Sequence, residues 1–334
     1  MIRLLVVALL LAAAPVVAQI ENPPVTIEDY PNTDGSTSAR PIARVLFLEM
    51  FGAPWEWQEL PAASPYDFSP GQEVVPTDPE GLAPAVAGRY PQIRLHHGTH
   101  DAWMRLLRGG SYTDGTSLIF ECRLPSEDER LEMARRGVAI DPLVIARDGF
   151  VFVVNERCQV DGLTLDQVRR IFLGEITRWS EVGGADEEIM PITRNRNSGS
   201  QETMITLVMD GREPLTPAQD LSGLEGMWGP FGFLIDDYDG RMIAFTFHSY
   251  WRQQVTNRGT KCLAIDGVAP TVETIASGEY PLTTDVYAVI RADEPEDSPA
   301  RRLRDWLLTD DGQSVIEHTG YVSLRQAGLL PADQ

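Results

Sequence analysis

The sequence predicts an α/β fold, and two observations carry that prediction. Short apolar segments typical of buried strands alternate with amphipathic segments of helical period along most of the chain. The 334 residues are 43% hydrophobic, which is enough for a packed core. At roughly 100–200 residues per domain, this length indicates two domains or one large one. We therefore expect largely parallel sheets flanked by helices.

The first half of the chain begins with a helix near Pro41, because proline fits a first helical turn and apolar residues follow. Residues 52–91 then carry many prolines, together with Trp55 and Trp57, so we expect a long loop with little regular structure. Beyond this loop, the pattern predicts helices at 101–108 and 125–136 and a strand at 116–120.

The second half contains the clearest strand, at 143–155, where residues 150–154 are all apolar. A helix at 164–173 places Leu165, Val168 and Ile171 on one face. The remaining alternation predicts strands at 189–193, 242–247, 261–265 and 286–290, and helices at 201–209, 271–277, 299–308 and 312–318.

The charge balance argues against two classes of partner. The chain has 49 acidic residues and 28 Lys plus Arg, for a net charge of −21. Nucleic acids and anionic membrane surfaces are bound by clustered basic residues, so neither is expected here. A small anion is not excluded, because a local site can oppose the overall field.

Residues 1–18 have the pattern of a cleaved secretory signal. Arg3 supplies a short positive segment, and residues 4–14 form an apolar run that is too short to span a bilayer comfortably. Ala18 is a small residue at the expected cleavage position. The alternative is an N-terminal membrane anchor. We expect a periplasmic or secreted protein without a later membrane span.

The cysteines are too few to be the main source of stability. Cys122, Cys158 and Cys262 allow at most one disulfide within the chain, and they contain no CxxC pair. Their pairing stays open at the sequence level.

Two segments place small hydroxyl residues where a helix is expected to start. One contains Ser36, Thr37 and Ser38, and the other is Ser198-Gly199-Ser200. Helix starts carry unpaired N–H groups that can receive an oxyanion, although Ser and Thr are also ordinary helix caps. Arg194 lies four residues before Ser198 and is a candidate for paired hydrogen bonds to a tetrahedral anion.

Other chemistries have weaker support. His96, His97, His100 and Asp101 are metal ligands in type, but a polar loop leading into a helix explains them equally well. The chain lacks the GxSxG, GxxxxGK[ST] and HExxH motifs. We therefore expect no metal, no cofactor and no catalytic residue.

A series of short motifs resembles the phosphate-binding proteins that serve ABC importers. The matching segments are DGST at 34–37, DPLV at 141–144, FVVN at 152–155, LT at 163–164, IFLGEITRW at 171–179, VGG at 182–184, Arg194 with SGS at 198–200, DGVAPT at 266–271, GEYPL at 278–282, WLL at 306–308, GQ at 312–313 and GYV at 320–322. The resemblance covers most of residues 32–325 in order, apart from 52–91.

This resemblance implies a two-lobed type II periplasmic binding protein, each lobe a mostly parallel sheet flanked by helices. The first lobe would contain residues 25–143 and 266–334, and the second 144–265. An anion would be held between them. The binding residues carried over from the family are Ser36, Thr37, Ser38, Thr99, Arg194, Ser198, Gly199 and Ser200.

The chain departs from the family at one position. The family usually has an aspartate just before the strand at 118–120, and this chain has Ser117 there. The aspartate accepts a hydrogen bond from protonated phosphate and repels a fully ionised oxyanion such as sulfate. We keep Ser117 as a candidate ligand-binding residue. Asp34, Asp101, Asp114 or Glu121 are candidates to replace the carboxylate, and Arg40 is a further candidate charge near the ligand.

The resemblance implies a monomeric periplasmic receptor that captures phosphate, or a related tetrahedral oxyanion, and delivers it to an ABC permease. Two alternatives stay open. One is a secreted hydrolase of phosphate esters, and the other is a surface or sensory protein that reuses the binding fold. The permease, the affinity and the role of residues 52–91 are not specified by the sequence.

Overall fold

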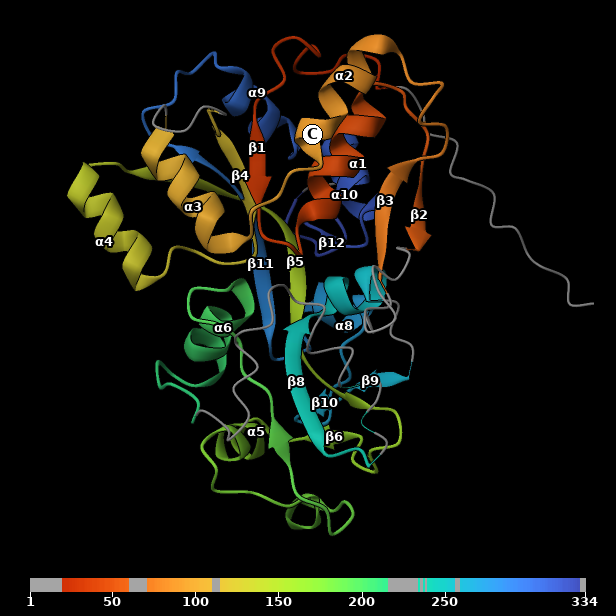
Figure 1. Ribbon diagram of the computed structural model, residues 1–334, viewed down its shortest axis with the longest axis vertical. Coiled ribbons are helices and arrows are strands. Elements are labelled where there is room, and N and C mark those ends of the chain that lie inside the picture. The colour runs from red at the N-terminus through yellow and green to blue at the C-terminus, as the bar shows by residue number, and fades with distance from the viewer. Residues whose placement is uncertain are drawn as a thin grey trace, which may run out of the picture.

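The computed structural model describes residues 20–59, 71–109, 115–215, 234, 237, 239–255 and 259–330. These residues form two lobes, one above the other in Figure 1. The expected signal at 1–18 and Asp114 lie outside the described residues. Within the described residues, no helix has both the length and the apolar character needed to cross a membrane.

The upper lobe combines the N-terminal third of the chain with its C-terminal end (Figure 1). Its elements are β1 (Thr33–Gly35), α1 (Arg40–Met50), β2 (Trp55–Glu59), β3 (Gln72–Pro76), α2 (Pro84–Ile93), α3 (Thr99–Arg108), β4 (Leu118–Glu121), α4 (Glu127–Arg136), α9 (Pro299–Trp306), α10 (Asp310–His318) and β12 (Val322–Ser323).

The lower lobe is built from the middle of the chain (Figure 1). Its elements are β6 (Gly162–Leu163), α5 (Leu165–Phe172), a 3-10 turn (Trp179–Val182), β7 (Met190–Pro191), α6 (Gly199–Thr203), a π-helical turn (Met204–Val208), β8 (Met242–Phe247), β9 (Thr260–Cys262) and β10 (Ala264–Ile265). A second π-helical turn (Tyr250–Gln254) and α8 (Val272–Ser277) lie near the junction of the lobes.

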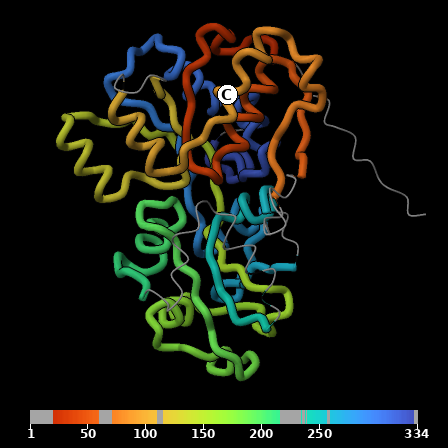
Figure 2. The backbone as a smooth tube through the Cα atoms, in the orientation of Figure 1, coloured from red at the N-terminus to blue at the C-terminus, as the bar shows by residue number. Residues whose placement is uncertain are grey.

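Two long strands, β5 (Ile140–Asn155) and β11 (Thr283–Arg291), connect the lobes. Figure 2 shows both passing through the narrow middle of the molecule. The strand order is β1-β4-β11-β5-β8-β7. The first part of β5 pairs with β11 in the upper lobe, and from Phe150 onward it pairs with β8 in the lower lobe. One continuous strand therefore belongs to both sheets.

The α/β class and the two-lobed architecture are confirmed. The pairing is more mixed than the expected parallel arrangement: β1–β4, β7–β8 and β6–β10 are parallel, whereas β11 and β5 pair antiparallel with their sheet neighbours. Parallel pairs need a crossover connection between strands. The two connecting strands instead run in opposite directions along one another, because one carries the chain down and the other carries it back.

The prediction of little regular structure at 52–91 was wrong. Strands β2 and β3 pair as an antiparallel ladder, and α2 follows them. Two of the prolines take positions that regular structure tolerates: Pro76 ends β3, and Pro84 lies in the first turn of α2. Pro91 lies inside α2, in its last turn. Trp55 is buried and its indole N–H donates to Glu49 at 2.9 Å, so this tryptophan anchors the ladder on α1. Residues 60–70 lie outside the described residues.

The three cysteines are free in this structure. Cys122 and Cys158 are buried, and Cys262 is partly buried. Stability therefore comes from apolar packing, which forms one cluster that continues through both lobes and a smaller one beneath α3.

Candidate functional site

A cavity of about 540 Å³ lies between the lobes. Its upper wall is the end of β1 and the start of α3, and its lower wall is the loop that leads into α6. Seven of the nine residues predicted from the sequence line it: Ser36, Thr37, Thr99, Arg194, Ser198, Gly199 and Ser200. That these residues bind an anion stays a prediction.

Ser38 and Ser117 are not among the described residues that line the cavity. The side chain of Ser38 is turned into the upper lobe, where its hydroxyl lies 2.7 Å from the Ser36 hydroxyl and 3.1 Å from the Cys122 sulfur. Ser117 precedes β4 at the end far from Ser36, and its N–H donates to the Asn32 carbonyl at 3.1 Å. Neither residue therefore lines the cavity, and both make their contacts within the upper lobe.

The upper wall follows from the close pairing of β1 with β4. The N–H of Ser36 donates to the Phe120 carbonyl at 3.0 Å, which holds the start of the loop against the sheet. A Cβ on Gly35 would lie 2.2 Å from the same carbonyl oxygen, so only glycine permits this approach. Gly98, with φ of 86°, makes the turn into α3 and brings Thr99 to the cavity.

The lower wall is set by Ser198, which caps α6 by accepting from the Gln201 N–H at 3.2 Å. The same Gln201 accepts from the Arg194 N–H through its side-chain oxygen at 2.9 Å. Asn197 has φ of 63°, which turns the loop between these two points. A Cβ on Gly199 would lie 3.0 Å from the Thr99 hydroxyl oxygen, so the two walls approach closely here.

The cavity is lined by the cations Arg194 and Arg196, by three histidines and by the acidic Asp101. Burial lowers the pKa of Arg194, but arginine stays protonated in proteins. Burial, with Arg40 and Arg44 nearby, lowers the pKa of His96 to about 3, so this imidazole is neutral near pH 7. The histidines at 96, 97 and 100 were not predicted to line an anion site, and they do line the cavity. Their position next to Thr99 in the sequence could have predicted that they lie at the cavity.

His97 and His100 are held by carboxylates of the upper lobe. His97 Nδ1 lies 2.6 Å from Asp34, and His100 Nδ1 lies 2.9 Å from Glu129. The hydrogen bond to Glu129 raises the pKa of His100, which adds positive character to the upper wall. No three His, Cys, Asp or Glu residues in the described part of the chain are grouped closely enough to hold a metal ion.

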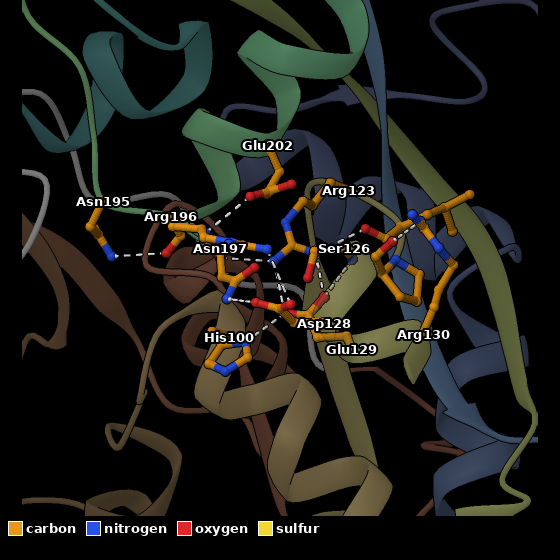
Figure 3. A network of polar contacts seen from close by, with 12 residues as sticks. His100, Arg123, Ser126, Asp128, Glu129, Arg130, Asn195, Arg196, Asn197 and Glu202 are labelled. Atoms are coloured by element: carbon orange, nitrogen blue, oxygen red, sulfur yellow. Dashed lines mark hydrogen bonds and ion pairs between the residues drawn. The ribbon is translucent and has the colours of Figure 1, made fainter. Parts of the chain in front are cut away.

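A network of polar contacts joins the lobes beside the cavity, and sequence reasoning missed it (Figure 3). We call Arg123, Asp128, Glu129, Arg196 and Asn197 the interlobe network. Arg123 donates to both oxygens of Glu129, at 2.6 and 2.9 Å, and across the cleft to the Asn197 carbonyl at 2.8 Å. Asp128 on α4 accepts from the Asn197 amide at 2.9 Å and pairs with Arg196 at 3.2 Å.

The sequence model of the PBP superfamily domain matches residues 123–311, which is more than half of the chain. A curated relative, the phosphate-binding protein PstS of Bacillus subtilis, is 29% identical over 228 residues, covering 66% of this chain and 71% of the relative.

Two solved structures share the fold. An ABC-type phosphate transport receptor from Vibrio cholerae has a TM-score of 0.57 at 19% identity, covering 88% of this chain and 99% of the other. A Clostridium perfringens protein crystallised with bound phosphate has a TM-score of 0.60 at 18% identity, with the same coverage of 88% and 99%. These likenesses show the fold. The match of the family model over residues 123–311, more than half of the chain, establishes that the chain belongs to the PBP superfamily.

Proposed function

We propose that this protein is a periplasmic receptor that captures phosphate, or a related tetrahedral oxyanion, between its two lobes and delivers it to an ABC permease. The relatives named above as phosphate-binding and phosphate-transport proteins support this ligand class. The role requires no bond to be made or broken, so we propose a binding protein and not an enzyme.

One observation carries the proposal. Residues about 160 positions apart in the chain, Thr37 and Ser198 among them, meet at a single cavity from opposite lobes. They contribute hydroxyl groups, backbone N–H groups and the Arg194 guanidinium, which are the donors that a tetrahedral anion accepts from. The chain as a whole carries a net charge of −21, so its electrostatic field repels anions. The donors at the cavity oppose this field locally.

We further propose that the lobes comprise residues 25–143 with 266–334, and 144–265. Among the described residues, the strands that pass between the lobes are β5, which pairs in both sheets, and β11, which pairs with β5. Bending at these two strands would separate the walls without disrupting either core, which is how a hinge admits and releases a ligand.

Among the described residues, no contact favours the alternative of a phosphate-ester hydrolase. An activated serine would be hydrogen-bonded to a base. In the described part of the cavity, the Ser36 hydroxyl instead contacts Ser38, and the Ser198 hydroxyl accepts from a backbone N–H.

Isothermal titration of the chain from residue 19 with phosphate, and with sulfate for comparison, tests the proposal. We expect one phosphate to bind per monomer. Binding of neither anion would refute the receptor function. Release of phosphate from a chromogenic ester, abolished by Ser198→Ala, would replace it with the hydrolase.

A further inference from the structure

Strand β4 ends with a carboxyl group at the same edge of the sheet as the cavity. Side chains alternate along a strand, so Ser117, Ile119 and Glu121 share one face. Ile119 packs beneath α3, which identifies that face. Gly35 is in register with Phe120, so Glu121 lies level with Ser36 where the parallel strands β1 and β4 end. Ser117 lies at the opposite end of the strand.

The Glu121 side chain is fully buried, and neither of its oxygens has a hydrogen-bond partner at ordinary geometry among the described residues. A buried polar group without a partner is costly, so it needs an explanation. Burial raises the pKa of Glu121 well above the ordinary value, and the carboxylates of Glu129 and Asp34 add to this effect against the opposing charge of Arg123.

Thr99 stands between Glu121 and the cavity. Thr99 is the first residue of α3, and α3 packs on the face of β4 that carries Glu121. Its side chain lines the cavity, and the nearby Thr99 hydroxyl partly opposes the rise in the Glu121 pKa. On the other side, a Cβ on Gly199 would lie 3.0 Å from the Thr99 hydroxyl oxygen. The hydroxyl is thus within reach of both Glu121 and any ligand held between the walls.

A hydroxyl has one proton to donate and two lone pairs that can accept. When the Thr99 proton is directed to the Glu121 carboxyl, the lone pairs of Thr99 are left to face the cavity. A protonated tetrahedral oxyanion such as hydrogen phosphate can donate its own proton to them. Sulfate is fully ionised at neutral pH and has no proton to donate, so its oxygen would meet an acceptor.

We propose that Glu121 sets the specificity of the cavity by orienting the Thr99 hydroxyl as an acceptor for a protonated tetrahedral oxyanion, in place of the aspartate that the family has where this chain has Ser117. This inference rests on the proposed function, because it presupposes that the cavity binds an oxyanion. Glu121 is a positioning residue that acts through Thr99.

Asp101 is the competing carboxylate. It lines the cavity, but it is exposed in the first turn of α3. Water can satisfy an exposed acceptor when the ligand offers no proton, so an exposed carboxylate discriminates weakly between the two anions. Glu121 and Thr99 are buried, so water cannot supply this hydrogen bond in place of the ligand, and the discrimination is stronger.

Titration calorimetry of Glu121→Met with phosphate and with sulfate at pH 7.5 tests the assignment. Methionine keeps the volume and removes the acceptor. We expect the ratio of phosphate affinity to sulfate affinity to fall by about tenfold or more, with sulfate affinity equal or higher. The thermal midpoint should be unchanged or higher, because a buried carboxyl without a hydrogen bond of ordinary geometry is lost. A purely structural role for Glu121 predicts the reverse: a lower midpoint and an unchanged ratio.

One further variant and one further ligand test the same assignment by calorimetry. Glu121→Gln retains an amide oxygen that can accept from Thr99, so it should preserve much of the ratio. Fluorophosphate, a tetrahedral dianion without a hydroxyl, needs no variant, and the unaltered protein should bind it as weakly as sulfate.

The outcomes separate this inference from the proposed function. If the unaltered protein binds neither anion, the receptor function fails and Glu121 loses its role with it. If it binds phosphate and sulfate equally, or if folded Glu121→Met keeps the ratio, the receptor stands and the role of Glu121 is overturned. Loss of the ratio in Asp101→Asn, but not in Glu121→Met, would assign the role to Asp101.

Discussion

The two walls of the cavity are built in different ways. Upper-wall residues have partners inside their own lobe: Ser36 contacts Ser38, His97 contacts Asp34, and His100 contacts Glu129. The lower wall is a loop whose residues Asn195 and Arg196 are exposed. Several of its polar groups find partners only across the cleft.

This difference indicates how the site works. The upper wall is organised by the sheet and by buried carboxylates, so it can keep its geometry whether or not a ligand is present. The lower wall contributes the cation Arg194 and gains contacts when the lobes meet. Ligand affinity should therefore depend on lower-wall charge and closure, and selectivity on the upper wall.

Removing the lower-wall cation should have the largest effect. Arg194→Ala deletes a charge-assisted donor pair, and we expect phosphate affinity to fall by roughly tenfold to a hundredfold. Arg135→Ala is the matched control, because Arg135 is exposed on α4 and pairs with Glu132 within that helix. Calorimetry that finds equal affinities for Arg194→Ala and the control would remove Arg194 from the site.

Preventing close approach of the walls should have the next largest effect. In Gly199→Ala the new Cβ would lie 3.0 Å from the Thr99 hydroxyl oxygen, tighter than ordinary contact. Overpacking of this kind costs about 1–3 kcal/mol, so we expect roughly tenfold weaker phosphate binding in calorimetry. Gly88→Ala is the control, since a Cβ there meets nothing within 4 Å. An unchanged affinity in Gly199→Ala would show that this close approach is unimportant for binding.

The cavity walls and the interlobe network differ in how far the sequence predicted them. The hydroxyl residues at 36–37 and 198–200 were predictable, because motifs of small polar residues before a helix have a local physical reason. Asp128 was not predictable, because its partners Arg196 and Asn197 are distant in sequence and meet it only through the arrangement of the lobes.

The fold likewise contains elements that the sequence predicted and elements that it did not. The long strand β5 was predicted from its apolar run, since burial on both faces leaves a continuous pattern. The β2–β3 ladder was missed, because prolines at its edges were taken to exclude regular structure throughout 52–91. A proline restricts the backbone at its own position and says nothing about the positions between prolines, and Pro91 is itself accommodated in the last turn of α2.

Weakening the interlobe network should have a smaller effect on affinity. Asp128→Asn removes the ion pair with Arg196 and leaves an amide that can still contact Asn197. Both charged side chains are substantially exposed, and such pairs contribute about 0.2–1 kcal/mol. We expect a loss of phosphate affinity of about twofold to fivefold at low salt, shrinking at high salt.

The control for Asp128→Asn is Glu132→Gln on the same helix. Glu132 pairs with Arg135 and Arg136 on α4 and with Arg108 on α3, all within the upper lobe. An equal loss of affinity in both variants, measured by calorimetry at two salt concentrations, would mean that α4 acts through its own stability and not through the interlobe contacts.

The smallest effect should be a pH-dependent change in stability at the upper wall. Hydrogen bonding to Glu129 raises the pKa of His100, so the folded protein binds this proton more tightly than the unfolded chain does. The pair therefore stabilises the fold fully below about pH 6.5, the ordinary pKa of histidine, and the contribution disappears as pH rises through the raised pKa. His100→Gln should lower the thermal midpoint more at pH 5 than at pH 8.

His318 offers a matched test of whether the His100 pair also serves the cavity. Its hydrogen bond to Glu49 likewise raises the pKa of His318, but it does not line the cavity. His318→Gln should show the same sign of pH dependence in melting experiments and leave phosphate affinity unchanged. His100→Gln should additionally weaken binding slightly at low pH, because the positive charge beside the ligand is lost. Identical behaviour of the two variants would make His100 a structural residue. Ligand selectivity at the upper wall would then depend on Thr99 and Glu121.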